Sequence, residues 1–203
     1  MPVLTLTQPV VTAPVPRKRW TVDEFHALYA LPKFENRRMI LVDGEILDMP
    51  APNPAHDVSI GQAQDLLQGV FGAGYWVRVQ MALVLNLKTD PIPDLAVVEG
   101  PKSRYASEHP TTAELVVEVA NSSLTYDLGD KADLYAAGGI ADYWVIDLVN
   151  RMLVVHRDPI VDAGSPFGHR YATRIELNES SSIAVSKVPS LTTNVVGFFP
   201  DKP

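Results

Sequence analysis

Short, dense runs of apolar residues, separated by turn residues, dominate the second half of this chain and predict buried strands. Residues 94–98 are apolar after a leading aspartate, and residues 115–120 are apolar except for Glu118. Runs of this length without polar alternation are typical of strands buried on both faces. The pattern also predicts a strand at Tyr143–Asp147 and a hairpin of Arg151–His156 with Tyr171–Leu177 around a loop rich in Asp, Gly and Pro.

The first half of the chain predicts helices and a hairpin. Thr21, with Glu24 three residues later, forms a capping-box pattern at the start of a short helix. Alternation from Arg38 to Met49 around Asp43-Gly44 predicts a hairpin, because Asp-Gly suits its tight turn. The remaining elements are a helix from Pro54 to about Val70, ended by Gly72 and Gly74, and a long strand from Trp76 to Leu87.

A further helix is predicted from Tyr126 to Gly138. Helical spacing places four side chains on its inward face and turns Asp130 and Asp133 away from the core. The inward side chains are those of Leu128, Lys131, Ala132 and Tyr135. A lysine on the packed face needs an anion nearby, whereas a solvated lysine would lie with the aspartates.

The order of these elements predicts an α/β domain with a central mixed sheet flanked by helices and preceded by an N-terminal β-hairpin. No internal repeat or linker divides residues 17–203, which we take as a single domain. Residues 1–16 are rich in Pro, Thr and Val without a sustained pattern, and they predict an extended arm. The arm is either disordered or a clasp against a neighbouring subunit.

Two acids interrupt the apolar strands of the second half. If these strands pair antiparallel around a connection centred near Tyr105, the start of the first lies beside the end of the second, so Asp94 lies near Glu118. Buried convergent carboxylates share a proton or bind a cation, and magnesium prefers oxygen ligands. Each acid also has a structural alternative, because Asp94 could cap a turn and Glu118 could face solvent at a sheet edge. The inward position of Lys131 favours a site.

Several motifs follow one another in order: Asp43-Gly44-Glu45-Ile46, Pro54-Ala55-His56, Pro93-Asp94, Glu118-Val119-Ala120, Asp127, Lys131, Tyr135 and Asp142-Tyr143-Trp144-Val145-Ile146-Asp147. Together they resemble the Uma-type restriction endonucleases, a bacterial branch of the PD-(D/E)XK nuclease superfamily. The similarity extends from about Phe25 to the C-terminus. It implies a restriction-endonuclease-like fold and a catalytic set of Asp94, Glu118 and Lys131, in which the two acids are the metal ligands.

One position departs from the superfamily pattern. The usual lysine two residues after the second acid is replaced by Ala120. The resemblance implies that Lys131 reaches in from the following helix instead, into the room that the small side chain leaves. A nuclease fold that has lost catalysis and is kept for binding would show the same substitution.

Five other residues are candidates for supporting roles, each with a structural alternative. Glu45 is either a further metal ligand or a solvated neighbour of a turn. His56 is either a base or a residue of the helix cap, and Gln80 is placed to orient water or phosphate. Tyr135 lies one turn after Lys131, where it packs with its hydroxyl at the site edge. Asp127 enters through the family resemblance.

Composition is that of a compact globular protein. The chain has 203 residues, of which 46% are hydrophobic and 20% charged, enough for a sizeable core. No run is long enough to span a bilayer, and the basic cluster Arg17-Lys18-Arg19 follows the N-terminal apolar stretch, unlike a signal peptide. We therefore expect a cytoplasmic protein that does not bind membranes. Cysteine is absent, which excludes disulfides and thiolate metal sites.

The charge balance bears on the substrate. A net charge of -7 is unlike the basic footprint of a simple nucleic-acid binder. Metal-dependent nucleases concentrate acids at the site, however, and three short basic groups are available to line a groove, unless they are ordinary solvated charges. They are Arg17-Lys18-Arg19, Arg37-Arg38 and Lys102 with Arg104.

Two hypotheses follow for function. The first is an endonuclease that hydrolyses DNA with magnesium, or manganese in its place, and that acts as a homodimer because cutting both strands usually needs two sites. The second is a catalytically degenerate nuclease fold that binds a partner or self-associates. The target sequence, and the choice between DNA and RNA, are not specified by any motif.

Overall fold

The structure, a computed structural model, describes residues 16–49, 51 and 53–202. Its elements in chain order are α1 (Val22–Tyr29), η1 (Pro32–Phe34), β1 (Met39–Val42), β2 (Glu45–Asp48), α2 (Pro54–Phe71), η2 (Gly72–Gly74), β3 (Tyr75–Val79), β4 (Leu95–Glu99), η3 (Lys102–Tyr105), β5 (Leu115–Ala120), α3 (Leu124–Leu128), α4 (Asp130–Ala137), β6 (Asp142–Asp147), β7 (Met152–Val161), β8 (His169–Asn178), β9 (Ser182–Ala184), β10 (Thr192–Asn194) and η4 (Val195–Phe198).

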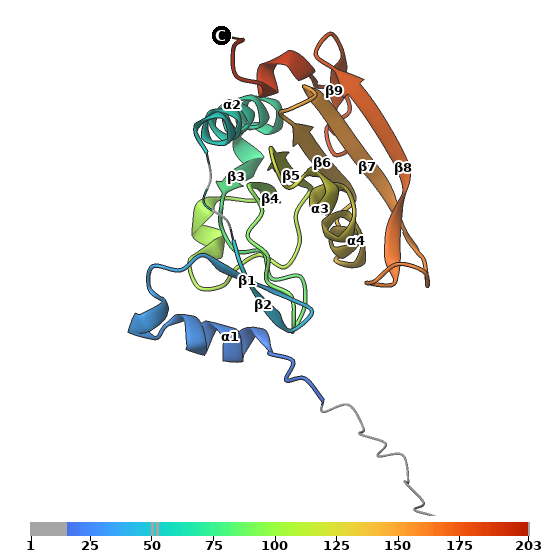
Figure 1. Cartoon of the computed structure of the whole chain (residues 1–203). Coiled ribbons are helices and arrows are strands. Elements are labelled where there is room, and N and C mark those ends of the chain that lie inside the picture. Colours follow the sequence, from blue (N-terminus) through green and yellow to red (C-terminus); the bar gives the residue numbers. More distant parts are fainter. Residues whose placement is uncertain (1–15, 50, 52, 203) are drawn as a thin grey trace, which may run out of the picture.

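A six-stranded mixed sheet forms the centre of the fold (Figure 1). The strand order is β3-β4-β5-β6-β7-β8, and only β5 and β6 run parallel. The parallel pair is connected through α3 and α4, as a parallel crossover requires. This architecture confirms the predicted α/β fold with a mixed sheet flanked by helices.

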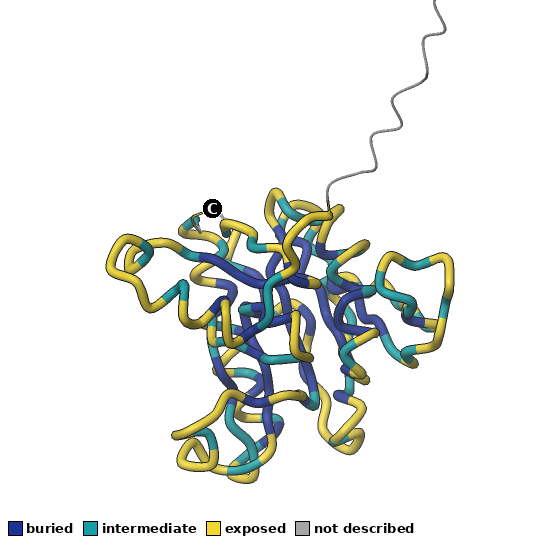
Figure 2. The backbone as a smooth tube through the Cα atoms, turned by 90° about the horizontal axis from the view of Figure 1, so that it is seen from below, coloured by how far each residue is buried: buried dark blue, intermediate teal, exposed yellow. Residues whose placement is uncertain are grey.

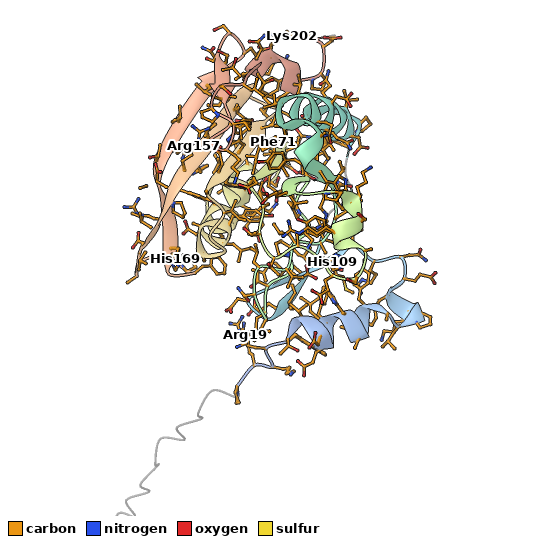
Figure 3. All side chains as sticks on the ribbon, turned by 180° about the vertical axis from the view of Figure 1, so that it is seen from behind. Arg19, Phe71, His109, Arg157, His169 and Lys202 are labelled. Carbon is orange, nitrogen blue, oxygen red and sulfur yellow. The ribbon has the colours of Figure 1, made fainter. Side chains whose placement is uncertain are left out.

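Helices cover the two faces of the sheet. The helix α2 buries Ile60, Ala63, Leu67 and Phe71, whose spacing of three and four residues forms one stripe, against inward side chains of β4 and β5. The opposite face packs against α4 through a second cluster that includes Tyr135. Figure 2 shows this buried interior surrounded by exposed loops, and Figure 3 labels Phe71 at the end of α2.

The predicted helix across 126–138 is wrong in one respect, because it is two helices. Gly129 separates α3 from α4 with φ -109° and ψ -107°, outside the helical region. A Cβ at this position would lie 3.0 Å from the Thr125 carbonyl oxygen. The break therefore depends on a close backbone approach that glycine permits. The predicted end at Gly138-Gly139 is confirmed, since Gly138 is the C-cap of α4 and Gly139 has φ +74°.

The N-terminal helix and hairpin agree with the predictions. Thr21 and Glu24 form the complete capping box of α1. The strands β1 and β2 pair through a turn in which Asp43 and Gly44 both have positive φ, 44° and 76°, as a type I′ hairpin requires. The hairpin packs on α1 through one face, and Figure 1 shows this unit on one side of the central sheet.

The predicted long strand from Trp76 to Leu87 is wrong after its first part. The strand β3 ends at Val79, and Gln80 takes φ 48°, which turns the chain out of the sheet. The segment that follows makes isolated backbone bonds, such as Leu83 N–H to Pro91 O at 2.9 Å, in place of a ladder. Of the apolar residues that follow the turn, Leu83 is buried, whereas Met81 and Leu87 are exposed, so the alternation here does not indicate a strand.

The C-terminal hairpin is confirmed and is longer than predicted, since β7 and β8 pair over ten residues each. The short elements β9, β10 and η4 were not predicted from the sequence. The predicted arm lies outside the described residues except for Pro16, and the proposed domain boundaries stay a prediction. Of the described helices, none combines the length and apolar character needed to cross a membrane.

A buried histidine on β7 should make stability depend on pH. His156 lies 5.7 Å from the ring centroids of Tyr143 and Tyr171, and burial, reinforced by Arg174, lowers its pKa to about 4. Because the unfolded chain takes up this proton first, the stabilisation is complete above about pH 6.5 and is lost as the pH falls toward 4. We expect His156→Phe to remove on the order of 1 kcal/mol of the stability loss between pH 7 and 5. Urea unfolding of both proteins at the two pH values measures it, and equal losses would contradict it.

Candidate active site

The pairing of β4 with β5 brings two acids together. Leu95 is in register with Val117, so Asp94, which directly precedes β4, lies beside Glu118 of β5. The Asp94 N–H donates to Glu118 Oε2 at 3.3 Å, and the Val119 N–H donates to Asp94 Oδ2 at 2.9 Å. The predicted antiparallel pairing of these strands is confirmed. Both side chains are almost fully buried, which excludes the alternative that Glu118 faces solvent.

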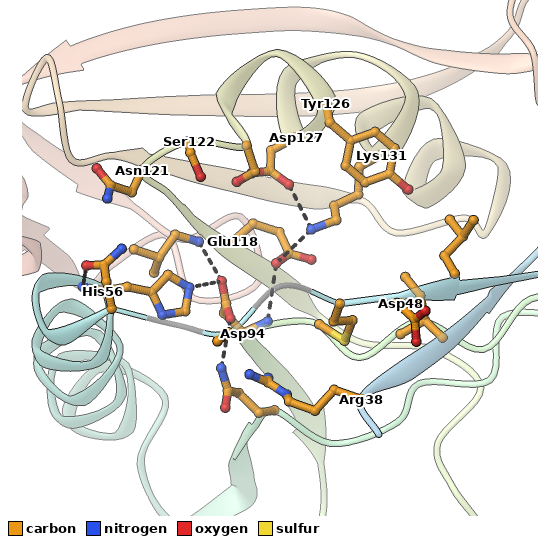
Figure 4. A pocket seen from close by; sticks show the side chains of 18 residues that line it. Arg38, Asp48, His56, Asp94, Glu118, Asn121, Ser122, Tyr126, Asp127 and Lys131 are labelled. Carbon is orange, nitrogen blue, oxygen red and sulfur yellow. Dashed lines mark hydrogen bonds and ion pairs between the residues drawn. The ribbon is translucent and has the colours of Figure 1, made fainter. Parts of the chain in front are cut away.

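The two acids form part of the lining of a cavity of about 340 Å³. Its walls come from β1 and β2, the start of α2, the strand ends around the acids, and α3 with α4 (Figure 4). The lining residues are Arg38, Ile40, Leu47, Asp48, Met49, Ala51, Asn53, His56, Gln80, Asp94, Glu118, Val119, Asn121, Ser122, Ser123, Tyr126, Asp127 and Lys131.

Lys131 is directed at the acids and is only 15% exposed. Its Nζ lies 3.2 Å from Glu118 Oε2 and 2.7 Å from Asp127 Oδ1. Burial opposes the charge of this ammonium, but the carboxylates of Glu118 and Asp127 outweigh burial and raise the pKa of Lys131. The lysine is therefore held as a cation beside the carboxylate pair, and Ser123 donates a hydrogen bond to Asp127 from behind.

Glu118 is the most strongly perturbed acid of the cavity. Burial raises the pKa of this carboxyl to about 8, and the charges of Asp94 and Asp127 act in the same direction, against Lys131. Tyr135 donates a hydrogen bond from its hydroxyl to Glu118 Oε1 at 2.8 Å. Without a further cation, the Glu118 carboxyl changes between its protonated and ionised forms near neutral pH.

Asp94 is held by two side chains. His56 Nε2 lies 3.1 Å from Asp94 Oδ2, and Gln80 donates from Nε2 to Asp94 Oδ1 at 3.2 Å. Although burial acts in the opposite direction, these hydrogen bonds and the one from Val119 lower the pKa of Asp94. The hydrogen bond with Asp94 raises the pKa of His56, against the effect of burial. His56 also lies in the helix cap, since its N–H donates to Asn53 Oδ1 at 3.2 Å.

Of the eight candidate residues, the structure brings seven together and leaves out Glu45. Glu45 is exposed at the start of β2 and pairs with Arg19 at 3.1 Å, so the prediction that it could join the metal ligands has no support in the geometry. Three further residues line the cavity but were not predicted from the sequence: Asn121, Ser122 and Tyr126. Their position in the loop and the first helical turn after β5 was the only feature that could have indicated them.

The adjacent carboxylates of Asp94 and Glu118 are of the donor type that divalent metal ions take. Within the described residues, no group of three or more His, Cys, Asp or Glu side chains is arranged around a single point for a metal ion. Magnesium commonly uses only one or two carboxylates and completes its shell with water and substrate phosphate. Asp94 and Glu118 are two adjacent carboxylates of this kind, and burial, which raises the pKa of Glu118, disfavours the ionised carboxyl that a bound cation would stabilise.

The raised pKa of Glu118 predicts a pH-dependent stability of the metal-free protein. Since the folded carboxyl binds its proton more tightly than the unfolded one, its favourable contribution is present below about pH 4.5 and is lost as the pH rises through about 8. We expect Glu118→Gln to melt a few degrees above the unsubstituted protein at pH 9 and with a smaller difference at pH 5. Calorimetric melting with a chelator present measures this, and a variant less stable at pH 9 would count against it.

The chain matches a known protein family and is similar to a solved structure. The sequence model of the Uma2 family, described as "Putative restriction endonuclease", matches residues 22–188. A solved structure described as a putative nuclease belonging to DUF820, from Anabaena variabilis, is similar with a TM-score of 0.64 and 16% sequence identity, over 88% of this chain and 97% of that chain. At this identity the similarity shows the fold alone. No curated protein matches the chain. Because the family match spans most of its length, the chain belongs to the Uma2 family of restriction-endonuclease-like nucleases.

Proposed function

We propose that this protein is a magnesium-dependent endonuclease that hydrolyses phosphodiester bonds in DNA. The observation that carries the proposal is the convergence of Asp94, Glu118 and Lys131 in one cavity, with the Lys131 Nζ 3.2 Å from Glu118. Family membership supports nuclease chemistry, and restriction-endonuclease-like nucleases generally use divalent metal ions.

In this mechanism, Asp94 and Glu118 would hold the metal ion through their carboxylate oxygens. The bound ion would lower the pKa of a coordinated water and neutralise charge on the phosphate. Lys131, kept charged by Asp127, orients the attacking water or donates a hydrogen bond to the phosphate oxygen on which negative charge develops. Water adds to phosphorus, the P–O bond to the leaving sugar breaks, and the products are an alcohol and a phosphate monoester.

Five hydrogen bonds support the two ligands in this proposal. Gln80, His56 and the Val119 N–H fix the orientation of Asp94. Tyr135 and the Asp94 backbone N–H fix Glu118. Preorganised carboxylates lose little freedom when a cation binds, so these contacts favour affinity as well as geometry. We therefore assign His56, Gln80 and Tyr135 as positioning residues.

A catalytically degenerate binding protein is the second candidate. The observation in its favour is that both carboxylates already have hydrogen-bond or ion-pair partners within the chain, so neither needs a metal ion for a partner. The net charge of -7 also disfavours tight binding of DNA outside the cavity. Metal affinity distinguishes the two candidates.

A two-fold dimer remains our proposal for the assembly. Cutting both strands of a duplex usually requires two sites, which a symmetric pair of subunits would supply. The arm proposed as a clasp lies outside the described residues, so its role stays a prediction.

Metal binding should depend on both acids. We expect magnesium or manganese to bind the unsubstituted protein, and Asp94→Asn or Glu118→Gln to lower the affinity by at least about tenfold while the fold persists, because each removes one of two ligands. Isothermal titration calorimetry measures the affinity, with Glu45→Gln as the matched control outside the cavity. Equal affinity in all four proteins would eliminate the proposed site, and no binding in any would favour the degenerate protein.

Cleavage should depend on Lys131. We expect Lys131→Ala to cut supercoiled plasmid about 10²–10³-fold more slowly than the unsubstituted protein, because it removes a charge placed beside the reacting phosphate. Magnesium affinity should be retained, since the lysine is not a ligand. Lys88→Ala, which changes an exposed lysine, is the control and should cut at the normal rate. A fully active Lys131→Ala protein would disprove the assigned role.

A further inference from the structure

The hairpin of β1 and β2 is apolar on both faces. Met39 and Leu41 pack on the cluster around α1, together with Ile46. Ile40 points to the other face, where it is buried against α4. Leu47 is in register with Ile40 on this face but stays exposed, so the packing of α4 leaves the β2 side of the face uncovered.

That second face forms one wall of the cavity that holds the acids. Ile40, Leu47 and Met49 line it, and the Leu47 residue remains 37% exposed. Tyr126 of α3 lines the same cavity and is 36% exposed. The centroid of its ring lies 5.6 Å from the Lys131 ammonium. An apolar wall in contact with water is unfavourable, and a ligand with a flat apolar surface would cover it.

Two cationic side chains line the cavity, together with the four carboxylates of Asp48, Asp94, Glu118 and Asp127. Lys131 and Arg38 both line it, and Figure 4 shows Arg38 across the two carboxylates from Lys131. Within the described residues Arg38 makes no ion pair, whereas the adjacent Arg37 is paired with Asp48. An arginine at a cavity rim without an acidic partner provides a fork of donors for a phosphate.

From these features we infer that the cavity holds one unpaired nucleotide of the substrate. Its base covers the apolar wall of Ile40, Leu47 and Met49, and its phosphate faces Arg38 and the acid and lysine cluster. The inference rests on the proposed nuclease function and specifies its substrate class as single-stranded or locally unpaired nucleic acid. A fully paired duplex must first unstack and unpair a base, which weakens its binding.

Binding without cleavage tests this preference. Fluorescence anisotropy with calcium in place of magnesium compares labelled oligodeoxythymidine with a perfectly matched duplex and with a duplex of the same length that contains a mismatch. We expect the single strand to bind at least about tenfold more tightly than the matched duplex, with the mismatched duplex between them, because unpairing costs least at a mismatch. Equal affinity for single strand and matched duplex would overturn the inference.

Substitution of Leu47 tests the apolar wall itself. Leu47→Ser should weaken binding of oligodeoxythymidine about fivefold, and Leu47→Tyr should retain or strengthen it because an aromatic ring offers a stacking surface. The matched control is Val149→Ser, which changes a residue that is 66% exposed and does not line the cavity. Circular dichroism confirms that each variant is folded.

An oligomer of abasic deoxyribose phosphates distinguishes the contribution of the base to the affinity from that of the phosphate. It keeps the negative charge but offers no base to the wall, so its affinity should be weaker and should not respond to Leu47→Ser. Arg38→Ala should lower the affinity for both oligomers about equally, and Arg37→Ala is the control. If Leu47→Ser and Val149→Ser bind oligodeoxythymidine with the same affinity, the inference fails. Plasmid cleavage that requires Lys131 would still support the proposed function in that case. Absence of any cleavage would defeat the proposed function and leave the binding comparison to decide the inference.

Discussion

The site depends on two carboxylates tied to the backbone of neighbouring strands. The N–H of Asp94 reaches Glu118, and the N–H of Val119 reaches Asp94, so each acid takes a position in the hydrogen-bonding pattern where β4 and β5 meet. Buried carboxylates are costly unless such bonds satisfy them. The same bonds fix the separation of the acids, and the antiparallel register of β4 and β5 therefore sets the geometry of the cavity.

Charge in this cavity is balanced by groups from separate elements. Lys131 comes from α4, Asp127 from α3 and His56 from α2, and each meets one of the strand acids or its partner. Burial nevertheless raises the pKa of Glu118 to about 8, and the neighbouring acids act in the same direction. In the proposed chemistry, a divalent cation would stabilise the ionised form of this carboxyl.

The position of the lysine follows from packing. Ala120, two residues after Glu118 on the same strand face, is fully buried in the cluster that includes Ala132 and Tyr135 of α4. A small side chain there lets the helix lie close to the sheet, and the break at Gly129 starts α4 just before Lys131. The helix that packs over Ala120 thus brings Lys131 to Glu118, where we propose that it takes the place of the usual strand lysine.

The sequence by itself determined the strands, the hairpin turn, the main helices and the convergence of Asp94 with Glu118, because apolar runs, Asp-Gly and strand order act locally or through simple pairing. It also indicated the inward face of Lys131 through helical spacing. Only the tertiary structure decided that β3 stops at Gln80, that Gly129 divides a helix, and that Glu45 lies outside the cavity. These outcomes depend on backbone turns and on contacts between distant segments, which no local pattern encodes. The position of the apolar wall opposite the acids also depends on tertiary packing. A hairpin pattern shows which residues share a face, but not which part of the fold that face contacts.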